Sequence, residues 1–214
     1  MTPSRIPLSA DGRELAALAP PPGRRFLLGI SGAPGAGKST LAAAVAASYD
    51  GVVVPLDGFH LADVELVRRG LRDRKGAPET FDADGYAALL ARIRSRPDHT
   101  VMAPLFERVL EQPVAGGIAV PPEADLVVTE GNYLLLEEAP WPAARAQLDT
   151  VWHVETADEI RLPRLVARHV RYGKSPEAAR EWVERVDGAN AVRIEAAAHR
   201  ADLILDLTAW EPPD

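Results

Sequence analysis

The most informative residues of this chain are Gly32-Ala33-Pro34-Gly35-Ala36-Gly37-Lys38-Ser39. Their letters match G-x-x-x-x-G-K-[ST], the pattern of a loop whose backbone N–H groups surround phosphate oxygens. The apolar residues 26–30 predict a buried strand before the loop, and the alanine-rich residues 40–48 predict a helix after it. The N-terminus of that helix directs free N–H groups and the positive end of its dipole at an anion. We therefore expect a nucleotide to bind here through its phosphates.

Each position of the loop has an expected role. Small residues let the backbone curl around an anion, and the residues expected to contact the nucleotide are Gly32, Gly35, Ala36, Gly37, Lys38, Ser39 and Thr40. Lys38 supplies a positive charge for the outer phosphates, which also makes it a catalytic candidate, and the Ser39 hydroxyl is a ligand for Mg²⁺. ATP and Mg²⁺ are thus the expected cofactors. The alternative is a glycine turn that precedes a helix by chance.

Length, charge and composition exclude several classes of protein. The chain has 214 residues, of which 47% are hydrophobic, a formal net charge of −7 and no cysteine. The acidic balance argues against a general nucleic-acid-binding protein, and the lack of cysteine excludes disulfides, thiolate catalysis and cysteine-ligated zinc. No apolar run approaches the roughly twenty residues of a membrane span, and the N-terminus has no signal-peptide pattern. We expect a cytoplasmic protein without a nucleic-acid or membrane partner.

Apolar runs alternate with helical stretches along the chain. Residues 52–56, 126–129, 151–154 and 203–205 predict further buried strands. Helices are predicted at residues 84–94, with Asp82 as the N-cap, and from Pro176, after Ser175. Such a pattern is typical of a parallel sheet covered on both faces. The expected fold class is therefore α/β: a three-layer P-loop nucleotide-hydrolase fold with about five parallel strands, helices on both faces and a small lid or ribbon insertion.

The pattern also suggests how the chain is organised. Residues 1–25, which end in a proline run, are expected to be an N-terminal extension, and residues 26–208 a single domain. Residues 99–121 are expected to be an insertion over the site, with residues 101–103 pairing with 118–120 around a turn at 115–117. A lid is expected at about residues 157–175.

Two carboxylates follow predicted strands, and ligands of parallel α/β sheets bind beyond the carboxyl ends of the strands. Glu130 occupies the position of an acid that orients Mg²⁺ or its water shell. Asp57 is the expected catalytic base, which accepts the proton of a hydroxyl, and the following Gly58 is expected to leave space for a substrate. The alternatives are a capping or loop carboxylate for Glu130 and a turn aspartate for Asp57.

Arg161, Arg164, Arg168 and Arg171 have the spacing of one helix face, within an arc of about 80°. Such a row can close over phosphates and stabilise charge on the transferring phosphoryl oxygens. Pro163 would begin or kink the helix and detach Arg161, so we expect Arg164 and Arg168 to bind the nucleotide and Arg168 to be catalytic. The alternative is a solvated basic face.

Two further segments are expected to face the substrate. Residues 72–82 are rich in charge and turn residues and include Lys75, and residues 104–108 place an aromatic side chain beside an acid and a base. Phe106 would stack on a small polar molecule, and Glu107 and Arg108 would form hydrogen bonds with it. His60 either touches the substrate or caps a turn. The expected substrate-binding residues are His60, Lys75, Phe106, Glu107 and Arg108.

Four motifs in this order resemble those of the uridine kinase, phosphoribulokinase and bacterial pantothenate kinase group. They are residues 32–40, Asp57-Gly58-Phe59-His60, residues 75–82 (Lys-Gly-Ala-Pro-Glu-Thr-Phe-Asp) and Glu130-Gly131-Asn132-Tyr133. The similarity covers roughly residues 25–208. It is greatest to the subgroup described as nucleoside kinase-like or fructose transport system kinase-like.

The resemblance implies a kinase domain that uses ATP to phosphorylate a hydroxyl group of a small metabolite, such as a nucleoside, a sugar or a pantothenate-like molecule. It assigns Lys38 and Ser39 to ATP and Mg²⁺ and Asp57 to the base. It places Arg164, Arg168 and Arg171 in the lid and Asn190 near a nucleotide-side segment. The family usually carries a tyrosine where this chain has Phe106, followed here by Glu107, so neither uridine nor pantothenate follows as the acceptor.

Other functions stay open at this point. A regulatory nucleotide-binding switch without a metabolic acceptor is the main alternative, although the chain lacks the Asn-Lys-x-Asp element of GTPases and the Leu-Ser-Gly-Gly element of transport ATPases. A kinase-like fold without catalysis is a further reading, which the presence of Lys38, Ser39, Asp57 and Glu130 disfavours. A homodimer is a reasonable expectation.

Overall fold

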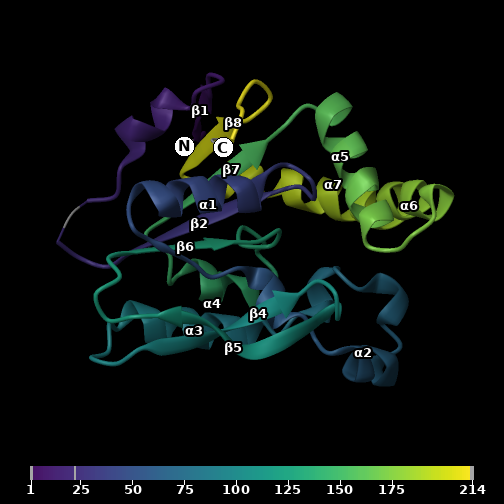
Figure 1. The fold of residues 1–214 in the computed structure, drawn as a ribbon, viewed down its shortest axis with the longest axis horizontal. Coiled ribbons are helices and arrows are strands. Elements are labelled where there is room, and N and C mark those ends of the chain that lie inside the picture. Colours follow the sequence, from purple (N-terminus) through teal and green to yellow (C-terminus); the bar gives the residue numbers. More distant parts are fainter. Residues whose placement is uncertain (1, 22, 213–214) are drawn as a thin grey trace.

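The chain forms a parallel sheet between two layers of helices in the computed structural model, which describes residues 2–21 and 23–212 (Figure 1). The strand order is β1-β8-β7-β2-β6-β3. The strands are β1 (Ser4–Pro7), β2 (Phe26–Gly32), β3 (Val52–Val53), β6 (Leu126–Glu130), β7 (Thr150–Glu155) and β8 (Leu203–Asp206). All neighbouring strands pair in parallel, which confirms the predicted fold class with six strands in place of five.

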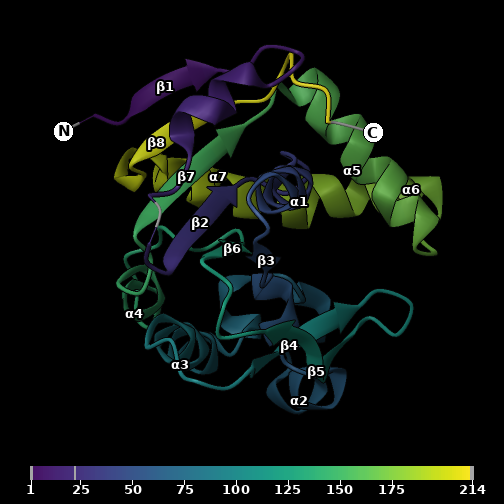
Figure 2. The ribbon, with the colours of Figure 1, turned by 60° about the vertical axis from the view of Figure 1, so that its left-hand side comes forward.

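Helices cover both faces because successive side chains of a strand point in opposite directions. Leu28 of β2 shares one core with Leu41 of α1 (Lys38–Ser48). Leu27 of the same strand shares the other core with side chains of α3 (Ala83–Arg94), α4 (Trp141–Arg145) and α7 (Gly188–Ala196). Figure 2 shows α1 and α7 on opposite sides of the sheet. The near-continuous apolar runs of the strands are therefore explained by burial on both faces.

The remaining helices are short or peripheral. They are α2 (Asp63–Arg69), α5 (Asp158–Arg171) and α6 (Pro176–Trp182), with 3₁₀ turns at Arg13–Leu18, Leu56–Phe59, Arg72–Arg74, Pro78–Thr80 and Ala198–Arg200 and a π-helical turn at Val183–Asp187. Two predicted N-caps are present: Asp82 Oδ1 accepts from Gly85 N at 2.9 Å, and Ser175 Oγ accepts from Ala178 N at 3.2 Å. Helix α5 is continuous through Pro163.

The strand β1 lies in the segment that we expected to be an N-terminal extension. It pairs with β8, with Arg5 opposite Ile204, and so forms an edge of the main sheet. Its four residues are largely exposed and carry no apolar run, which is why the sequence pattern did not reveal it. The division of the chain into an extension and a domain at residues 26–208 stays a prediction.

Two local predictions need correction. The predicted strand at residues 52–56 is limited to β3, and Asp57 lies in the 3₁₀ turn that follows, not directly at a strand end. The predicted ribbon is a longer hairpin of β4 (Val101–Glu107) and β5 (Gln112–Val120), whose turn lies at residues 108–111 and not at 115–117. The register shifts between Ala103 and Leu105, around Pro104, which has no N–H to donate.

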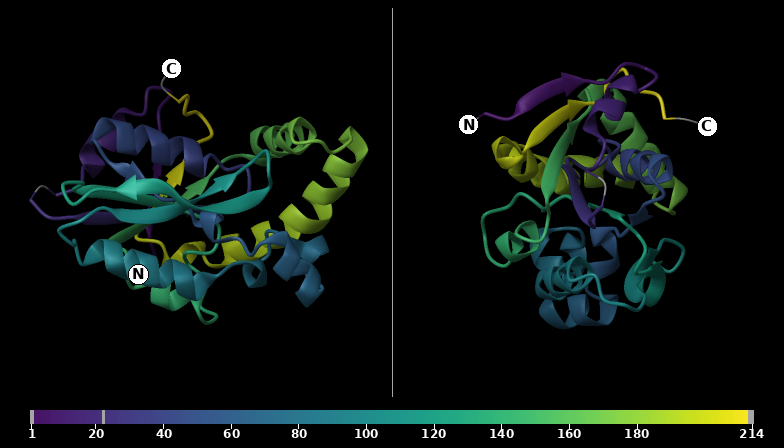
Figure 3. Two further views of the ribbon diagram at one scale, coloured as in Figure 1. Left: turned by 60° about the horizontal axis from the view of Figure 1, so that its bottom comes forward. Right: turned by 90° about the vertical axis from the view of Figure 1, so that its left-hand side faces the viewer.

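The hairpin and the arm formed by α5 and α6 project from the sheet at the same end of the molecule (Figures 1 and 3). The phosphate-binding loop lies between them, at the carboxyl end of β2. The two projections therefore form the walls of the region in which a ligand can bind.

Within the described residues, no helix combines the length and the apolar character needed to cross a membrane.

Candidate active site

The phosphate-binding loop joins β2 to α1. Gly35 and Gly37 have φ angles of 81° and 94°, left-handed values that favour glycine and let the loop curl. Lys38 is buried, and its Nζ donates to the carbonyl oxygens of Gly32 at 2.9 Å and Ala33 at 3.0 Å. Burial lowers the pKa of Lys38 to about 8. The loop thus carries a charged group at the helix end that also offers free N–H groups to an anion.

A buried arginine supports this loop. Arg161 of α5 donates from Nη1 to the carbonyl oxygen of Pro34 at 3.0 Å, and from Nε and Nη2 to Asp158 Oδ1 at 2.9 and 2.6 Å. Its side chain is therefore drawn into the loop and away from the row that Arg164 and Arg168 continue. We expected Pro163 to detach Arg161 from the row by beginning or kinking the helix. The helix instead continues through Pro163, and the contact with Pro34 is what turns the Arg161 side chain away from the row.

Ser39 and Glu130 meet beside the loop. Ser39 Oγ donates to Glu130 Oε1 at 2.9 Å, and the Glu130 side chain is buried. Burial raises the pKa of Glu130, and the nearby carboxylate of Asp57 raises it further, whereas Lys38 opposes the rise. A hydroxyl and a carboxylate side by side are hard oxygen ligands, the type that Mg²⁺ prefers.

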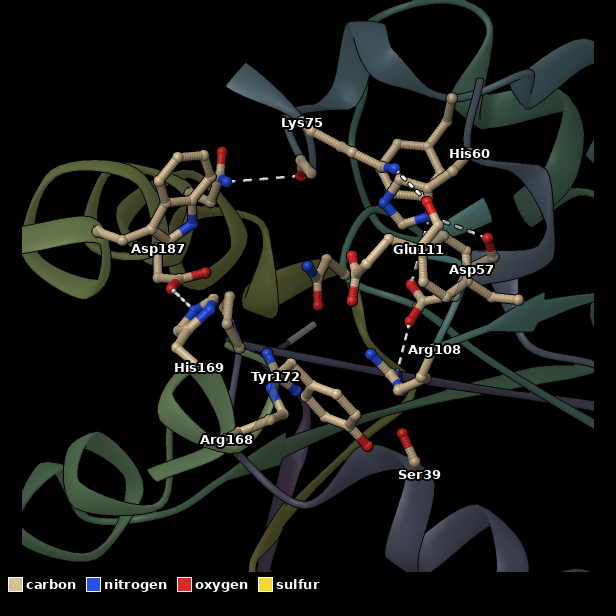
Figure 4. Close-up of a pocket in the computed structure, with 18 of the residues that line it drawn as sticks. Ser39, Asp57, His60, Lys75, Arg108, Glu111, Arg168, His169, Tyr172 and Asp187 are labelled. Atoms are coloured by element: carbon tan, nitrogen blue, oxygen red, sulfur yellow. Dashed lines mark hydrogen bonds and ion pairs between the residues drawn. The ribbon is translucent and has the colours of Figure 1, made fainter. Parts of the chain in front are cut away.

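Asp57 lies at the centre of a small polar network. Its Oδ2 accepts from Arg108 Nη2 at 3.1 Å, and its backbone carbonyl lies 2.9 Å from His60 Nδ1 (Figure 4). The His60 ring packs against Phe81 and Phe106, with ring centroids 4.0 and 4.9 Å away, and burial lowers the pKa of His60. His60 therefore caps the turn and also lines the site, whereas its contact with a substrate stays a prediction.

Gly58 allows the hairpin to approach Asp57 closely. A Cβ atom at position 58 would lie 2.5 Å from the carbonyl oxygen of Pro104. The space beside Asp57 that we expected a substrate to occupy is thus filled at this point by the hairpin backbone. This contact brings Arg108 within reach of the carboxylate.

A cavity of about 300 Å³, the Asp57 cavity, opens between the hairpin, the 3₁₀ turn at Leu56–Phe59 and the arm (Figure 4). It is lined by nine of the predicted site residues: Lys38, Ser39, Asp57, His60, Lys75, Phe106, Arg108, Glu130 and Arg168. Lys75 reaches it with its Nζ 2.7 Å from Asp63 Oδ1 and 5.5 Å from the centroid of the Phe106 ring.

A second cavity of about 510 Å³, the P-loop cavity, lies at the phosphate-binding loop and the start of α1. It is lined by residues 35–40, by Arg164 and Arg168 of α5, and by Leu207 and Trp210 near the C-terminus. The side chains that line both cavities are Lys38, Ser39, Arg108 and Arg168. The two cavities therefore meet at a point surrounded by cationic groups and by the Ser39 hydroxyl.

Not every predicted residue reaches these cavities. Glu107 lines neither of them; its Oε1 accepts from Val109 N at 3.0 Å, and alternation along β4 turns it away from the side of Phe106. Arg171 also lines neither cavity, and Gly32 contributes only the carbonyl that Lys38 contacts. The functional roles of the predicted residues stay predictions.

The structure adds residues that sequence reasoning missed. Asn132 lines the Asp57 cavity and follows Glu130 closely, so its position in Glu130-Gly131-Asn132 was an available signal. His169, Tyr172, Lys174 and Trp182 of the arm also line it, as does Asp187 of the π-helical turn. Asn190, which the resemblance had placed on the nucleotide side, lines it too. The arm residues carry no local motif, because they meet the cavity only through the packing of α5, α6 and the π-helical turn.

Comparisons with known proteins find similarity to kinases of small molecules. No protein-family model matches the chain. A candidate uridine kinase of Schizosaccharomyces pombe is 32% identical over 195 residues, which are 85% of this chain and 83% of that protein. A pantothenate kinase of a Nocardioides species is 32% identical over 122 residues, which are 54% of this chain but only 37% of that enzyme. The crystal structure of a candidate fructose transport system kinase from Silicibacter sp. TM1040 has a TM-score of 0.78 at 41% identity, covering 89% of this chain and 94% of that one.

Proposed function

The chain belongs to the P-loop kinases of the uridine kinase and pantothenate kinase group, and we propose that it transfers the γ-phosphoryl group of ATP to a hydroxyl group of a small metabolite. Membership of a family of ATP-dependent kinases implies that ATP would be the phosphoryl donor. The reaction forms a bond between the acceptor oxygen and the γ-phosphorus, breaks the bond to the β,γ-bridging oxygen, and releases ADP.

The arrangement of the cavities is the observation that carries the proposal. The P-loop cavity suits the nucleotide, with phosphates at residues 35–40 and the base near Leu207 and Trp210. The Asp57 cavity suits the acceptor. Because Lys38, Ser39, Arg108 and Arg168 line both cavities, a γ-phosphate held there would lie between its donor and its acceptor.

The chemistry of Ser39 and Glu130 fits a magnesium ion. Both groups are oxygen ligands, and the buried carboxylate, whose pKa is raised, would gain from a nearby cation. The described residues contain no cluster of three or more His, Asp or Glu side chains placed for a metal, which agrees with an ion held mainly by phosphate and water oxygens. When bound, Mg²⁺ would neutralise charge on the phosphate oxygens.

The remaining roles follow from what each side chain touches. Asp57 would accept the proton of the acceptor hydroxyl and align its oxygen, with the carboxylate held in place by Arg108. Arg168, which lines both cavities, would stabilise charge on the transferring phosphoryl oxygens, and Arg164 would bind the nucleotide. Lys38 would hold the outer phosphates in place of its present carbonyl partners.

The main alternative is a regulatory nucleotide hydrolase without an acceptor. The Asp57 cavity favours a kinase, because a nucleotide switch has no need of a second polar cavity that opens onto the phosphate site. A homodimer and a cytoplasmic location stay predictions.

ADP release with and without acceptors tests the proposal. Purified protein, ATP and Mg²⁺ are mixed with nucleosides, sugars, sugar acids and pantothenate, and ADP is followed by a coupled assay. A kinase releases ADP at a rate that depends on one acceptor class and yields a phosphorylated product by mass spectrometry. A slow ADP release that is the same with every acceptor would instead support the regulatory hydrolase.

A further inference from the structure

The Asp57 cavity is positively charged although the protein is acidic. The chain has a formal net charge of −7, yet the charged groups lining this cavity are six cations, Lys38, Arg72, Lys75, Arg108, Arg168 and Lys174, and four carboxylates, Asp57, Glu111, Glu130 and Asp187. A cleft whose local charge opposes the net charge attracts anions. Bound nucleotide phosphates would account for Lys38, Arg108 and Arg168, which line both cavities, but not for the other three cations.

Ion pairs show which cations are already engaged. Arg72 Nη2 and Lys75 Nζ each lie 2.7 Å from a carboxylate oxygen of Asp63, and Arg108 is paired with Asp57. Among the residues that the structure describes, Lys38, Arg168 and Lys174 have no carboxylate oxygen within 4.0 Å. Lys38 and Arg168 lie where the two cavities meet, but Lys174 lines the Asp57 cavity alone.

The backbone of the arm holds Lys174 in a defined place. Helix α5 ends in a motif in which Lys174 N donates to the carbonyl oxygen of His169 at 3.1 Å and Gly173 N donates to that of Val170 at 3.0 Å. The ammonium group of Lys174 lies 4.2 Å from the centroid of the Trp182 ring. A half-buried cation is therefore positioned on an aromatic face without a carboxylate partner.

The neighbouring groups also face the cavity in fixed orientations. His169 Nε2 donates to Asp187 Oδ2 at 2.8 Å, so the carboxylate of Asp187 is engaged and sets the orientation of the imidazole (Figure 4). Asp187 is buried and belongs to the π-helical turn at Val183–Asp187, an irregularity that frequently occurs at functional sites.

We propose that His169, Lys174, Trp182 and Asp187 form an anion subsite at the arm side of the Asp57 cavity, so that the acceptor is an alcohol carrying a carboxylate or a phosphate group. This proposal rests on the proposed kinase function and names its substrate class. The reactive hydroxyl lies at Asp57 and the anionic group at Lys174, with the imidazole of His169 beside it. A neutral nucleoside or sugar would leave the Lys174 ammonium without a counter-charge. The small volume of the cavity, about 300 Å³, suits a compact metabolite.

Matched acceptors that differ only in charge test the subsite. Glycerol, glycerate and glycerol 3-phosphate share one carbon skeleton, and pantothenol and pantothenate, or ribose and ribose 5-phosphate, form further pairs. Binding is measured by calorimetry with a non-hydrolysable ATP analogue and Mg²⁺, and turnover by ADP release. We expect an anionic member of at least one series to bind and react at least about tenfold better than its neutral partner. Comparison of the carboxylate and phosphate members shows which anion the subsite takes.

Three variants link the effect to the subsite. Lys174→Met keeps an apolar stem on Trp182 but removes the charge, and we expect it to raise KM for the anionic acceptor about tenfold with little change in kcat or in KM for ATP. Lys174→Arg should recover most of the affinity. Arg180→Met, which removes an exposed charge from α6 outside the cavity, is the matched control and should behave as wild type.

The possible outcomes separate the two proposals. If neutral acceptors bind or react as well as their anionic partners, or if Lys174→Met matches Arg180→Met, the subsite is wrong while the kinase function stands. If anionic acceptors bind in a Lys174-dependent way but none is phosphorylated, the subsite stands and the kinase function is wrong. If no member of the panel binds, the subsite proposal fails.

Discussion

Arg108 Nη2 lies 3.1 Å from Asp57 Oδ2, and this ion pair joins the hairpin to the turn that follows β3. The two residues come from segments that are separated by the whole of α2 and α3. Arg108 also lines both cavities, so the position of the hairpin determines how the proposed base is oriented and would place a cation beside the proposed transferred group.

Asp57→Asn should abolish phosphoryl transfer but leave nucleotide binding intact. The amide cannot accept the proton of the acceptor hydroxyl, so we expect kcat to fall by about 100-fold or more. The Kd for ATP should change by less than about twofold, since the P-loop cavity does not include this side chain. Asp73→Asn, in an exposed turn, is the matched control. Near-native turnover of Asp57→Asn would remove Asp57 from the role of base.

Gly58→Ala should displace the hairpin. Its Cβ would lie 2.5 Å from the carbonyl oxygen of Pro104, a backbone atom that can yield only if the hairpin moves. We expect a loss of about 1–3 kcal/mol in unfolding free energy and a raised KM for the acceptor, because Phe106 and Arg108 move with the hairpin. KM for ATP should stay close to wild type. Gly188→Ala, where the nearest atom is 3.4 Å away, is the control, and equal behaviour of both variants would contradict the argument.

The affinity for ATP should fall as the pH rises through about 8. Burial lowers the pKa of Lys38 to about 8 from 10.5, so the ammonium of the free enzyme loses its proton in this range and binds phosphates less well. Between about pH 8 and pH 10.5 the unfolded chain binds more protons than the native protein at Lys38. Lys38 therefore adds to the unfolding free energy as the pH rises, so unfolding does not cause the expected loss of ATP affinity.

Lys38→Arg tests this assignment, because a guanidinium keeps its charge over the whole range. The measurement is kcat/KM for ATP from neutral to alkaline pH, with the melting temperature recorded at each point. Wild type should show the alkaline decline and the variant a flatter profile at lower absolute activity. If both proteins show the same alkaline decline in kcat/KM, a group other than Lys38 causes it.

Arg161→Ala should weaken nucleotide binding although Arg161 lines neither the Asp57 cavity nor the P-loop cavity. Its side chain holds the carbonyl oxygen of Pro34, and its loss frees the loop and leaves a buried acceptor unpaired. We expect the Kd for ATP to rise about tenfold and the acceptor KM to change little. Arg171→Ala, on the same helix but outside both cavities, should bind ATP as wild type does; a similar loss in the two variants would point to a general effect on α5.

The stability of the protein should fall in acid through His153. This residue is buried in β7, its Nδ1 has no hydrogen-bond partner within the described residues, and burial lowers its pKa to about 4 from 6.5. On acidification, the imidazole of the unfolded chain takes up a proton near pH 6.5, whereas that of the native protein does so only near pH 4. The unfolding free energy therefore falls by up to about 3 kcal/mol as the pH drops from 6.5 to about 4.

Urea unfolding of wild type and His153→Gln at about pH 7 and about pH 5 measures this contribution. Wild type should lose more stability on acidification than the variant does. His99→Gln, at an exposed position, should keep the wild-type pH dependence. An equal acid loss in wild type and His153→Gln would show that His153 does not contribute.

Much of the fold could be predicted because the signals are contiguous. Residues 32–39 specify a phosphate-binding loop between a strand and a helix, and apolar runs mark the strands that are buried on both faces. The prediction missed β1, an exposed edge strand of four residues, and misplaced the turn of the hairpin, whose β5 strand is largely exposed and contains two glycines. Strands that are not buried on two faces lack the apolar run on which such predictions depend.

The phosphate-binding loop, the α/β class and the position of Glu130 at the end of β6 could be predicted from the sequence alone, because they depend on neighbours in the chain. Which side chains meet could not be predicted, because it depends on segments that are distant in the chain. Arg108 reaches Asp57 because the hairpin packs closely over Gly58, Glu107 turns away because side chains alternate along β4, and Arg161 supports Pro34 from a distant helix. Lys174 faces the cavity because of how α5 ends and α6 begins. Such contacts depend on how the two projections pack against the sheet, and no local pattern of residues records that packing.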